Sequence, residues 1–156
     1  MDVVALGELL IDFTENGVSG QGNPLFEANP GGAPCNVLAM LSRLGHRTAF
    51  IGKVGNDHYG DFFRENLRKN NIEDKVLVSE LLPSGVASTF ISPDGERTFG
   101  TYLGAAASLK AEELSLDMFK GYAYLFIEGY LVQDHEMILH AIELAKEAGL
   151  QRDRRN

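Results

Sequence analysis

The chain alternates short apolar segments with longer segments whose apolar residues recur at helical spacing, and this alternation narrows the folds open to it. Residues 3–13 and 48–54 have the apolar character of buried strands, and residues 33–44 and 59–70 have the pattern of amphipathic helices. Strands joined by helices in this way lie parallel in one sheet, with the helices packed on its faces. The sequence therefore predicts an α/β fold with a mainly parallel, doubly wound sheet.

The alternation breaks in two places. Residues 16–32 are rich in Gly and Pro and show little periodicity, so we expect a loop there with one short strand near residues 25–28. Loops of this length usually close over another part of the molecule or over a bound partner. Residues 86–92 and 97–103 flank the turn sequence Pro93-Asp94-Gly95-Glu96, and they predict a β-hairpin.

The alternation resumes with a strand at 124–127 and a helix at 134–148. A further buried strand should follow Leu150, but residues 151–156 carry three Arg and no apolar residue. We therefore expect one domain over residues 1–150, cut short, and an atypical basic tail, with an ordinary frayed terminus as the alternative. A sheet cut short would leave part of the last helix uncovered, and its apolar stripe is Ile138, Ile142 and Ala145.

Composition limits the partners. The 156 residues carry a net charge of −8, which disfavours phosphate backbones and anionic lipid, and no apolar run is long enough to cross a bilayer. We expect neither nucleic acid nor a membrane as a partner. Cys35 is the only cysteine and the four His lack zinc-site spacing, so we expect a cytoplasmic protein without a disulfide or a metal site.

A pair of glycines, Gly31 and Gly32, runs directly into the start of the first predicted helix. Adjacent glycines let a backbone approach a ligand closely, and the free amides of a helix's first turn can donate to hydroxyl or anionic groups. Asn36 adds an amide to the same turn. The alternative is a tight turn with a helix cap and no ligand.

Two carboxylates close predicted strands. Asp12 ends the first strand, and Glu128 ends the strand at 124–127. Open α/β sheets bind their ligands at the carboxyl ends of their strands, where a carboxylate can accept hydrogen bonds from neighbouring hydroxyls. An Asp that only caps a loop is the alternative for Asp12.

Nucleotide-binding loops are absent from the sequence. Gly52-Lys53 is followed by Val54, whereas the phosphate loop needs Ser or Thr after its Lys to bind magnesium. The first strand likewise lacks the glycine fingerprint of dinucleotide-binding folds. We therefore expect no cofactor-binding residue within this chain.

Three motifs together resemble the opening signature of the ribokinase-like carbohydrate kinases, also called the PfkB family. In chain order they are Gly7-Glu8-x-x-x-Asp12, Pro30-Gly31-Gly32-Ala33-Pro34-x-Asn36 and Gly52-x-Val54-Gly55-x-Asp57-x-x-Gly60. The resemblance covers residues 2–150 and implies a ribokinase-like doubly wound sheet, truncated, with helices on both faces. It also implies a small β lid formed by residues 14–30 and 86–103. The substrate-binding residues that it implies are Asp12, Gly31, Gly32, Asn36, Arg97, Tyr102 and Glu128.

The family resemblance implies ATP-dependent phosphorylation of a sugar hydroxyl, with ATP and magnesium as cofactors of the full-length parent and none bound by this fragment. The family's catalytic Asp belongs to a Gly-Ala-Gly-Asp motif, and no Asp after Gly60 is preceded by Gly-x-Gly. We expect that Asp to lie beyond the chain end and the fragment to be inactive, because phosphoryl transfer needs positioned charge around the γ-phosphate.

The substrate is less constrained than the family. Residues 1–60 look most like fructokinases, whereas residues 100–106 and 127–130 look more like the adenosine-kinase-like branch. The expected ligand is a sugar or a nucleoside. One alternative is a non-catalytic module that binds sugar or forms a homodimer through the edge of the lid hairpin. Another is an α/β domain that binds no small molecule.

Overall fold

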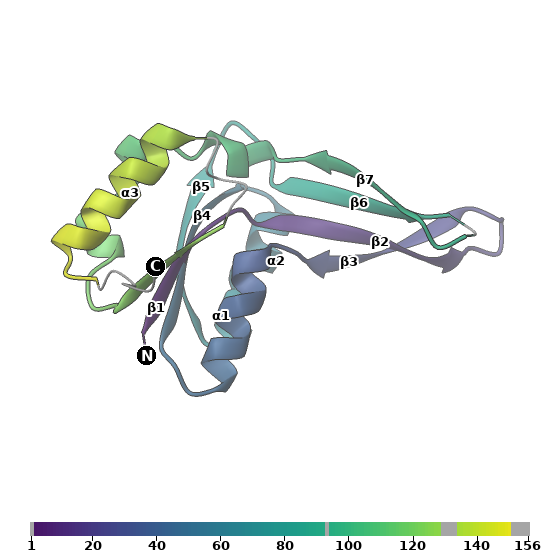
Figure 1. The fold of residues 1–156 in the computed structure, drawn as a ribbon. Coiled ribbons are helices and arrows are strands. Elements are labelled where there is room, and N and C mark those ends of the chain that lie inside the picture. Colours follow the sequence, from purple (N-terminus) through teal and green to yellow (C-terminus); the bar gives the residue numbers. More distant parts are fainter. Residues whose placement is uncertain (1, 93, 129–133, 151–156) are drawn as a thin grey trace.

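The computed structural model describes residues 2–92, 94–128 and 134–150, whose strands form two four-stranded sheets (Figure 1). All neighbouring strands of the main sheet are parallel. The lid sheet mixes parallel and antiparallel pairs. The main sheet has the order β5 (Ile72–Ser79), β4 (Thr48–Gly55), β1 (Val3–Leu6), β8 (Tyr124–Ile127). The lid sheet has the order β3 (Pro24–Pro30), β2 (Leu10–Val18), β6 (Gly85–Ile91), β7 (Arg97–Tyr102).

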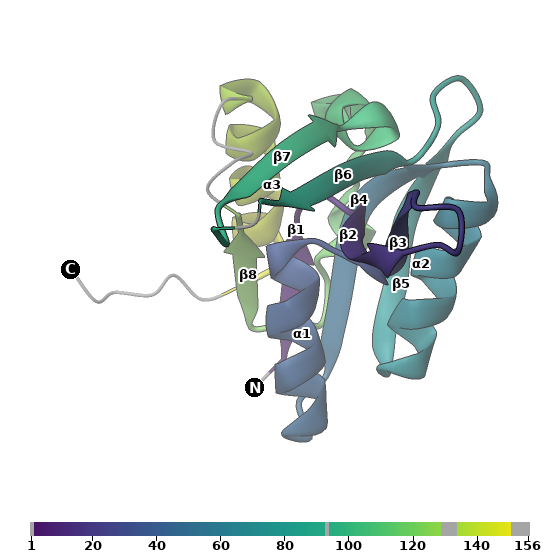
Figure 2. The ribbon, with the colours of Figure 1, turned by 90° about the vertical axis from the view of Figure 1, so that its right-hand side faces the viewer.

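Helices cover both faces of the main sheet (Figures 1 and 2). One face carries α1 and α2, and the other carries α3 together with three short 3-10 helices. The predicted α/β class, with its mainly parallel sheet and helices on both faces, is confirmed. The helices are α1 (Ala33–Arg43), α2 (His58–Lys69), α3 (His135–Glu147), η1 (Gly104–Ser108), η2 (Ala111–Glu113) and η3 (Leu116–Met118).

The side-chain alternation of β1 explains its central place. Val3 and Ala5 enter the core beneath α1 and α2, while Val4 and Leu6 enter the core beneath α3. All four residues are buried, because successive side chains of a strand point to opposite faces and both faces are covered. The continuous apolar run therefore belongs to a strand that is enclosed on both sides.

The sequence of helix α2 explains its first turn and its two faces. The Asp57 side chain accepts a 2.8 Å hydrogen bond from the amide of Gly60 and caps the first turn. Phe63 is buried on the inner face. On the outer face, Lys69 Nζ lies 2.9 Å from Glu65 Oε1, one helical turn away.

The prediction of one strand over residues 3–13 was wrong. The chain leaves the main sheet after β1 and enters the lid sheet as β2, so Asp12 belongs to a lid strand. The Gly- and Pro-rich segment 16–32 is not mainly loop either, because β2 continues to Val18 and β3 spans seven residues. Both strands are exposed at their far ends, so no apolar periodicity marked them.

Two further features differ from expectation. Strand β5 was not predicted, because its first half carries the three consecutive charged residues Glu73, Asp74 and Lys75 instead of an apolar run. The expected exposed stripe on α3 is also wrong, since Ala145 is 5% exposed and Ile138 packs against the core. Among the described helices, none is long and apolar enough to span a bilayer.

Candidate functional site

The polar residues of interest gather where the main sheet meets the lid sheet. Strands β1 and β8 end side by side, with Leu6 in register with Ile127, and Glu8 and Glu128 follow these ends. The chain then runs into β2, and β3 returns it to the start of α1. The carboxyl ends of parallel strands are where open α/β sheets place their ligands.

Asp12 and Gly31 are in close contact. Asp12 lies opposite Asn29 in the β2–β3 ladder, and the Gly31 amide donates a 2.8 Å hydrogen bond to the Leu10 carbonyl. A Cβ atom at Gly31 would overlap the Asp12 carboxylate. Glycine is therefore required here for the carboxylate to keep its place.

Gly32 turns the chain into α1. Its φ of 113° disfavours residues with a side chain, and a Cβ atom would lie 2.6 Å from the Glu8 carbonyl oxygen. It is the N-cap of α1 and offers no side-chain cap, so the first-turn amides keep donors for a ligand. Asn36 is exposed in that turn.

Three carboxylates share this edge, and burial raises the pKa of each. The pKa of Asp12 and that of Glu8 are raised by desolvation, and the pKa of Glu128 is raised by desolvation and then by repulsion from Glu8. Glu128 Oε2 is buried without a hydrogen-bond partner among the described residues. Such groups gain from a ligand that donates hydrogen bonds to them, as a polyhydroxylated molecule does.

Comparison with known proteins places the chain in a family. The family model described as pfkB family carbohydrate kinase matches residues 1–155. The chain belongs to the PfkB family. It is 39% identical to "Probable fructokinase-3" of Arabidopsis thaliana over 94% of this chain and 45% of that protein. The chain thus spans about half the length of the curated relatives it matches.

Solved structures support the same fold. "Fructokinase from Xylella fastidiosa" superposes with a TM-score of 0.84 at 24% identity, covering 96% of this chain and 48% of that one. A sugar kinase of Pyrococcus horikoshii, solved in complex with ATP, has a TM-score of 0.79 at 26% identity over 90% of this chain and 48% of its own. The ribokinase-like fold expected for a PfkB chain is therefore confirmed.

The structure brings together five of the seven residues that the resemblance implies. Asp12, Gly31, Gly32, Asn36 and Glu128 belong to the segments that converge at the junction of the two sheets. These residues form the candidate site of this PfkB chain, which we call the carboxylate edge together with Glu8.

Arg97 and Tyr102 lie elsewhere. Tyr102 pairs with Val86, which pairs with Ile11, so it occupies the lid face opposite that of Asp12. Arg97 is exposed at the far end of β7, four residues and about 13 Å along the strand from the row that contains Asp12. The structure does not bring either side chain to the carboxylate edge.

Sequence analysis missed three residues near Asp12. Glu8 follows β1 by two positions and was quoted in a motif without a role. Asn29 faces Asp12 across the ladder, and Thr101 shares its row through Ala87. The register of the lid strands was the missing signal, and it depends on turn geometry that sequence periodicity did not reveal.

The carboxylate edge does not fit a triphosphate. No basic group lowers the pKa of Asp12, Glu8 or Glu128, and three desolvated carboxylates repel a polyanion. Within the described ranges, no group of three or more His, Cys, Asp or Glu is arranged to hold a metal ion. The edge is suited to a neutral ligand rich in hydroxyl groups.

Proposed function

We propose that this chain is the substrate-binding half of a sugar kinase that transfers the γ-phosphoryl group of ATP to a sugar hydroxyl, with fructose as the first candidate. The observation that carries the proposal is the contact of the Asp12 carboxylate with Gly31 at the junction of the two sheets. This contact holds the Asp12 carboxylate against the Gly31 backbone, which has no side chain to obstruct a ligand. The fructokinase relatives favour fructose.

The chemistry at this edge is recognition of hydroxyl groups. The ionised carboxylates of Asp12 and Glu128 accept hydrogen bonds from sugar hydroxyls, and charge-assisted hydrogen bonds of this kind are stronger than neutral ones. The amides at the start of α1 and the Asn36 carboxamide supply donors. The lid sheet, which carries Asp12, then lies over the ligand and excludes water from it.

We further propose that ATP and magnesium are bound by the part of a full-length PfkB kinase that this chain does not align with. The family and the ATP complex of a similar sugar kinase support ATP as the phosphoryl donor. The carboxylate edge repels phosphate, and the chain has no Gly-x-Gly-Asp sequence. A coupled assay for ADP release with fructose or adenosine should therefore give the rate of the protein-free blank, and turnover clearly above that rate would overturn this part.

The binding proposal is tested by titrating fructose and adenosine, in parallel, into the chain and its Asp12→Asn variant by isothermal calorimetry. We expect the variant to bind fructose at least tenfold more weakly, about 1.4 kcal/mol, because the amide loses the negative charge and replaces one acceptor oxygen with a donor. Asp94→Asn is the matched control, since Asp94 is exposed in the hairpin turn. Equal affinities for Asp12→Asn and the control would leave Asp12 as a structural residue, and tighter binding of adenosine would make the substrate a nucleoside.

We also propose that two copies pair through the lid hairpin. All six residues of β7 are exposed at the edge of the lid sheet, and Phe99 is 62% exposed. An unpaired edge strand with apolar side chains is a template for pairing with a second chain. Light scattering across a concentration series should show a dimer that Phe99→Lys disperses. A monomer at every concentration would contradict the pairing without affecting sugar binding.

A further inference from the structure

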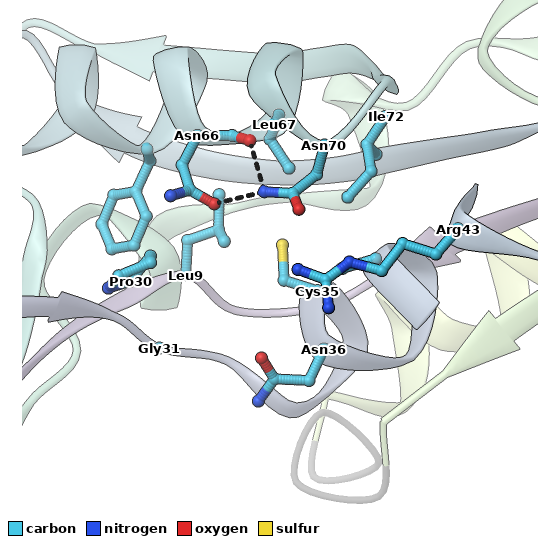
Figure 3. A pocket seen from close by; sticks show the side chains of 12 residues that line it. Leu9, Pro30, Gly31, Cys35, Asn36, Arg43, Asn66, Leu67, Asn70 and Ile72 are labelled. Atoms are coloured by element: carbon cyan, nitrogen blue, oxygen red, sulfur yellow. Dashed lines mark hydrogen bonds between the residues drawn. The ribbon is translucent and has the colours of Figure 1, made fainter. Parts of the chain in front are cut away.

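A hollow lies between α1 and α2 (Figure 3). Its volume is about 260 Å³, and it is lined from both helices and from the Pro30–Gly31 turn. Asp12, Glu8 and Glu128 do not line it, whereas Gly31 and Asn36 do, so the hollow adjoins the carboxylate edge without containing its carboxylates. We refer to it as the interhelical groove.

The charge of the groove is unusual for this protein. Arg43 is the only charged residue among the twelve that line it, although the chain as a whole carries a net charge of −8. Within the described part of the chain, the Arg43 guanidinium has no ion pair, whereas Arg47 and Arg64 each pair with a carboxylate. The lining of the groove therefore offers one guanidinium and no carboxylate, which favours an anion.

The polar groups beside Arg43 are held in place. Asn70 Nδ2 donates to the Asn66 carbonyl at 2.9 Å and to Asn66 Oδ1 at 3.0 Å. Figure 3 shows the Cys35 thiol and the Arg43 guanidinium directed toward Asn70, whereas the Asn36 carboxamide points away from them. Burial raises the pKa of the Cys35 thiol to about 12, so this sulfur is neutral and does not oppose an anion.

The floor of the groove is apolar. Leu9, Phe63 and Leu67 line it and are themselves at most 2% exposed. The volume of about 260 Å³ is several times the space that one water molecule needs, so a ligand of a few carbon atoms can enter with its charged group. An apolar floor with a few polar groups is the composition of small-molecule sites.

We propose that the interhelical groove binds a small oxyanion with an apolar body, such as a short-chain carboxylate or a phosphate ester. The Arg43 guanidinium pairs with the oxyanion, and the apolar body rests on Leu9, Phe63 and Leu67. This site does not depend on the sugar-binding proposal, because Arg43, Asn70 and the apolar floor are not part of the carboxylate edge, and only Gly31 and Asn36 border both.

The single cysteine supplies the test, since a ligand in the groove covers the Cys35 thiol. Cys35 reacts only through its small thiolate fraction, so its slow alkylation by iodoacetamide is followed at alkaline pH by intact mass spectrometry, with butyrate or with its neutral isostere butyramide. At a butyrate concentration about three times Kd, the rate should fall about fourfold, because only a quarter of the sites stay free. Butyramide should protect much less. Inorganic phosphate, as a third probe, tells whether the oxyanion suffices without the apolar body.

Three variants separate the ligand site from a general effect of charge. Arg43→Gln should abolish the difference between butyrate and butyramide, whereas Arg43→Lys, which keeps a positive charge, should retain part of it. Arg68→Gln removes the same charge from an exposed position of α2 that does not line the groove. In this variant butyrate should protect Cys35 as strongly as it does in the original chain. Circular dichroism confirms that each variant is folded. Equal protection by butyrate and butyramide, or protection by butyrate that survives in Arg43→Gln, would overturn the proposal.

Discussion

The main sheet and the lid sheet have the same number of strands but are stabilised differently. In the main sheet, β1 and most of β4 are buried on both faces. In the lid sheet, β7 is exposed throughout and most of β3 is exposed, so these strands rely on backbone pairing. The end of the lid sheet nearest the main sheet packs on the helices. There the rings of Phe13 and Tyr59 meet edge to face, with their centroids 5.7 Å apart. Stability therefore resides in the main sheet, and local opening of the lid costs less free energy than global unfolding.

The largest expected effect contrasts two phenylalanines. Phe50 in β4 is fully buried, and Phe50→Ala should lower the free energy of unfolding by about 3–5 kcal/mol through lost burial and the cavity left behind. Phe99 in β7 is 62% exposed, and Phe99→Ala should change it by less than about 0.5 kcal/mol. Urea denaturation of both variants provides the measurement. Comparable losses would show that the lid contributes to stability as much as the main sheet does.

The next effect contrasts two glycines of the lid region. A Cβ at Gly31 overlaps the Asp12 carboxylate, so Gly31→Ala should displace this carboxylate and weaken fructose binding at least tenfold, about 1.4 kcal/mol. A Cβ at Gly100 meets nothing within 4 Å, so Gly100→Ala should bind as before. Calorimetric titration distinguishes the two. Unchanged binding by Gly31→Ala would place the sugar elsewhere.

The amino-terminal ends of the main-sheet strands carry an ion-pair cluster whose effect depends on pH. The hydrogen bond from Tyr122, together with Lys75 and Arg47, lowers the pKa of Glu73 from 4.5 to about 2. The ionised carboxylate thus stabilises the fold above pH 4.5, and this contribution is lost as the pH falls from 4.5 toward 2. Because Glu73 is 44% exposed, solvent screening limits it to about 1 kcal/mol. Over this range, urea midpoints should fall less for Glu73→Gln than for the original chain, and parallel curves would rule the contribution out.

The smallest effect has the opposite sign and lies at the carboxylate edge. Desolvation and repulsion from Glu8 raise the pKa of Glu128. The free energy of unfolding therefore falls as the pH rises through that pKa, and at neutral pH the ionised carboxylate destabilises the fold. Glu128→Gln should therefore raise the free energy of unfolding at pH 7 by about 0.5 kcal/mol while weakening sugar binding. Thermal melts at pH 5 and pH 7 test this. Destabilisation at pH 7 would mean that the carboxylate is satisfied in the folded protein.

The same contrast explains how far the sequence predicted the structure. Helices α1, α2 and α3 and strands β4 and β8 lie close to their predicted bounds. Their burial is visible in the sequence, as helical spacing of apolar residues in the helices and as continuous apolar runs in the strands. The lid strands β2 and β3 show no such apolar pattern at their exposed ends. For this reason Asp12 was assigned to the wrong sheet. Tyr102 was expected beside Asp12, but the register of the lid strands places it on the opposite face of the lid.

A map of amide chemical-shift changes during a fructose titration tests the central claim most directly. The account predicts that the largest changes appear at Asp12, Gly31, Gly32, Asn36 and Glu128, where the two sheets meet. Glu73 and Tyr122, at the opposite end of the main sheet, should not shift. Changes concentrated at the far end of the lid or at Glu73 and Tyr122, or no change at any fructose concentration, would contradict the assignment of the carboxylate edge as a sugar site.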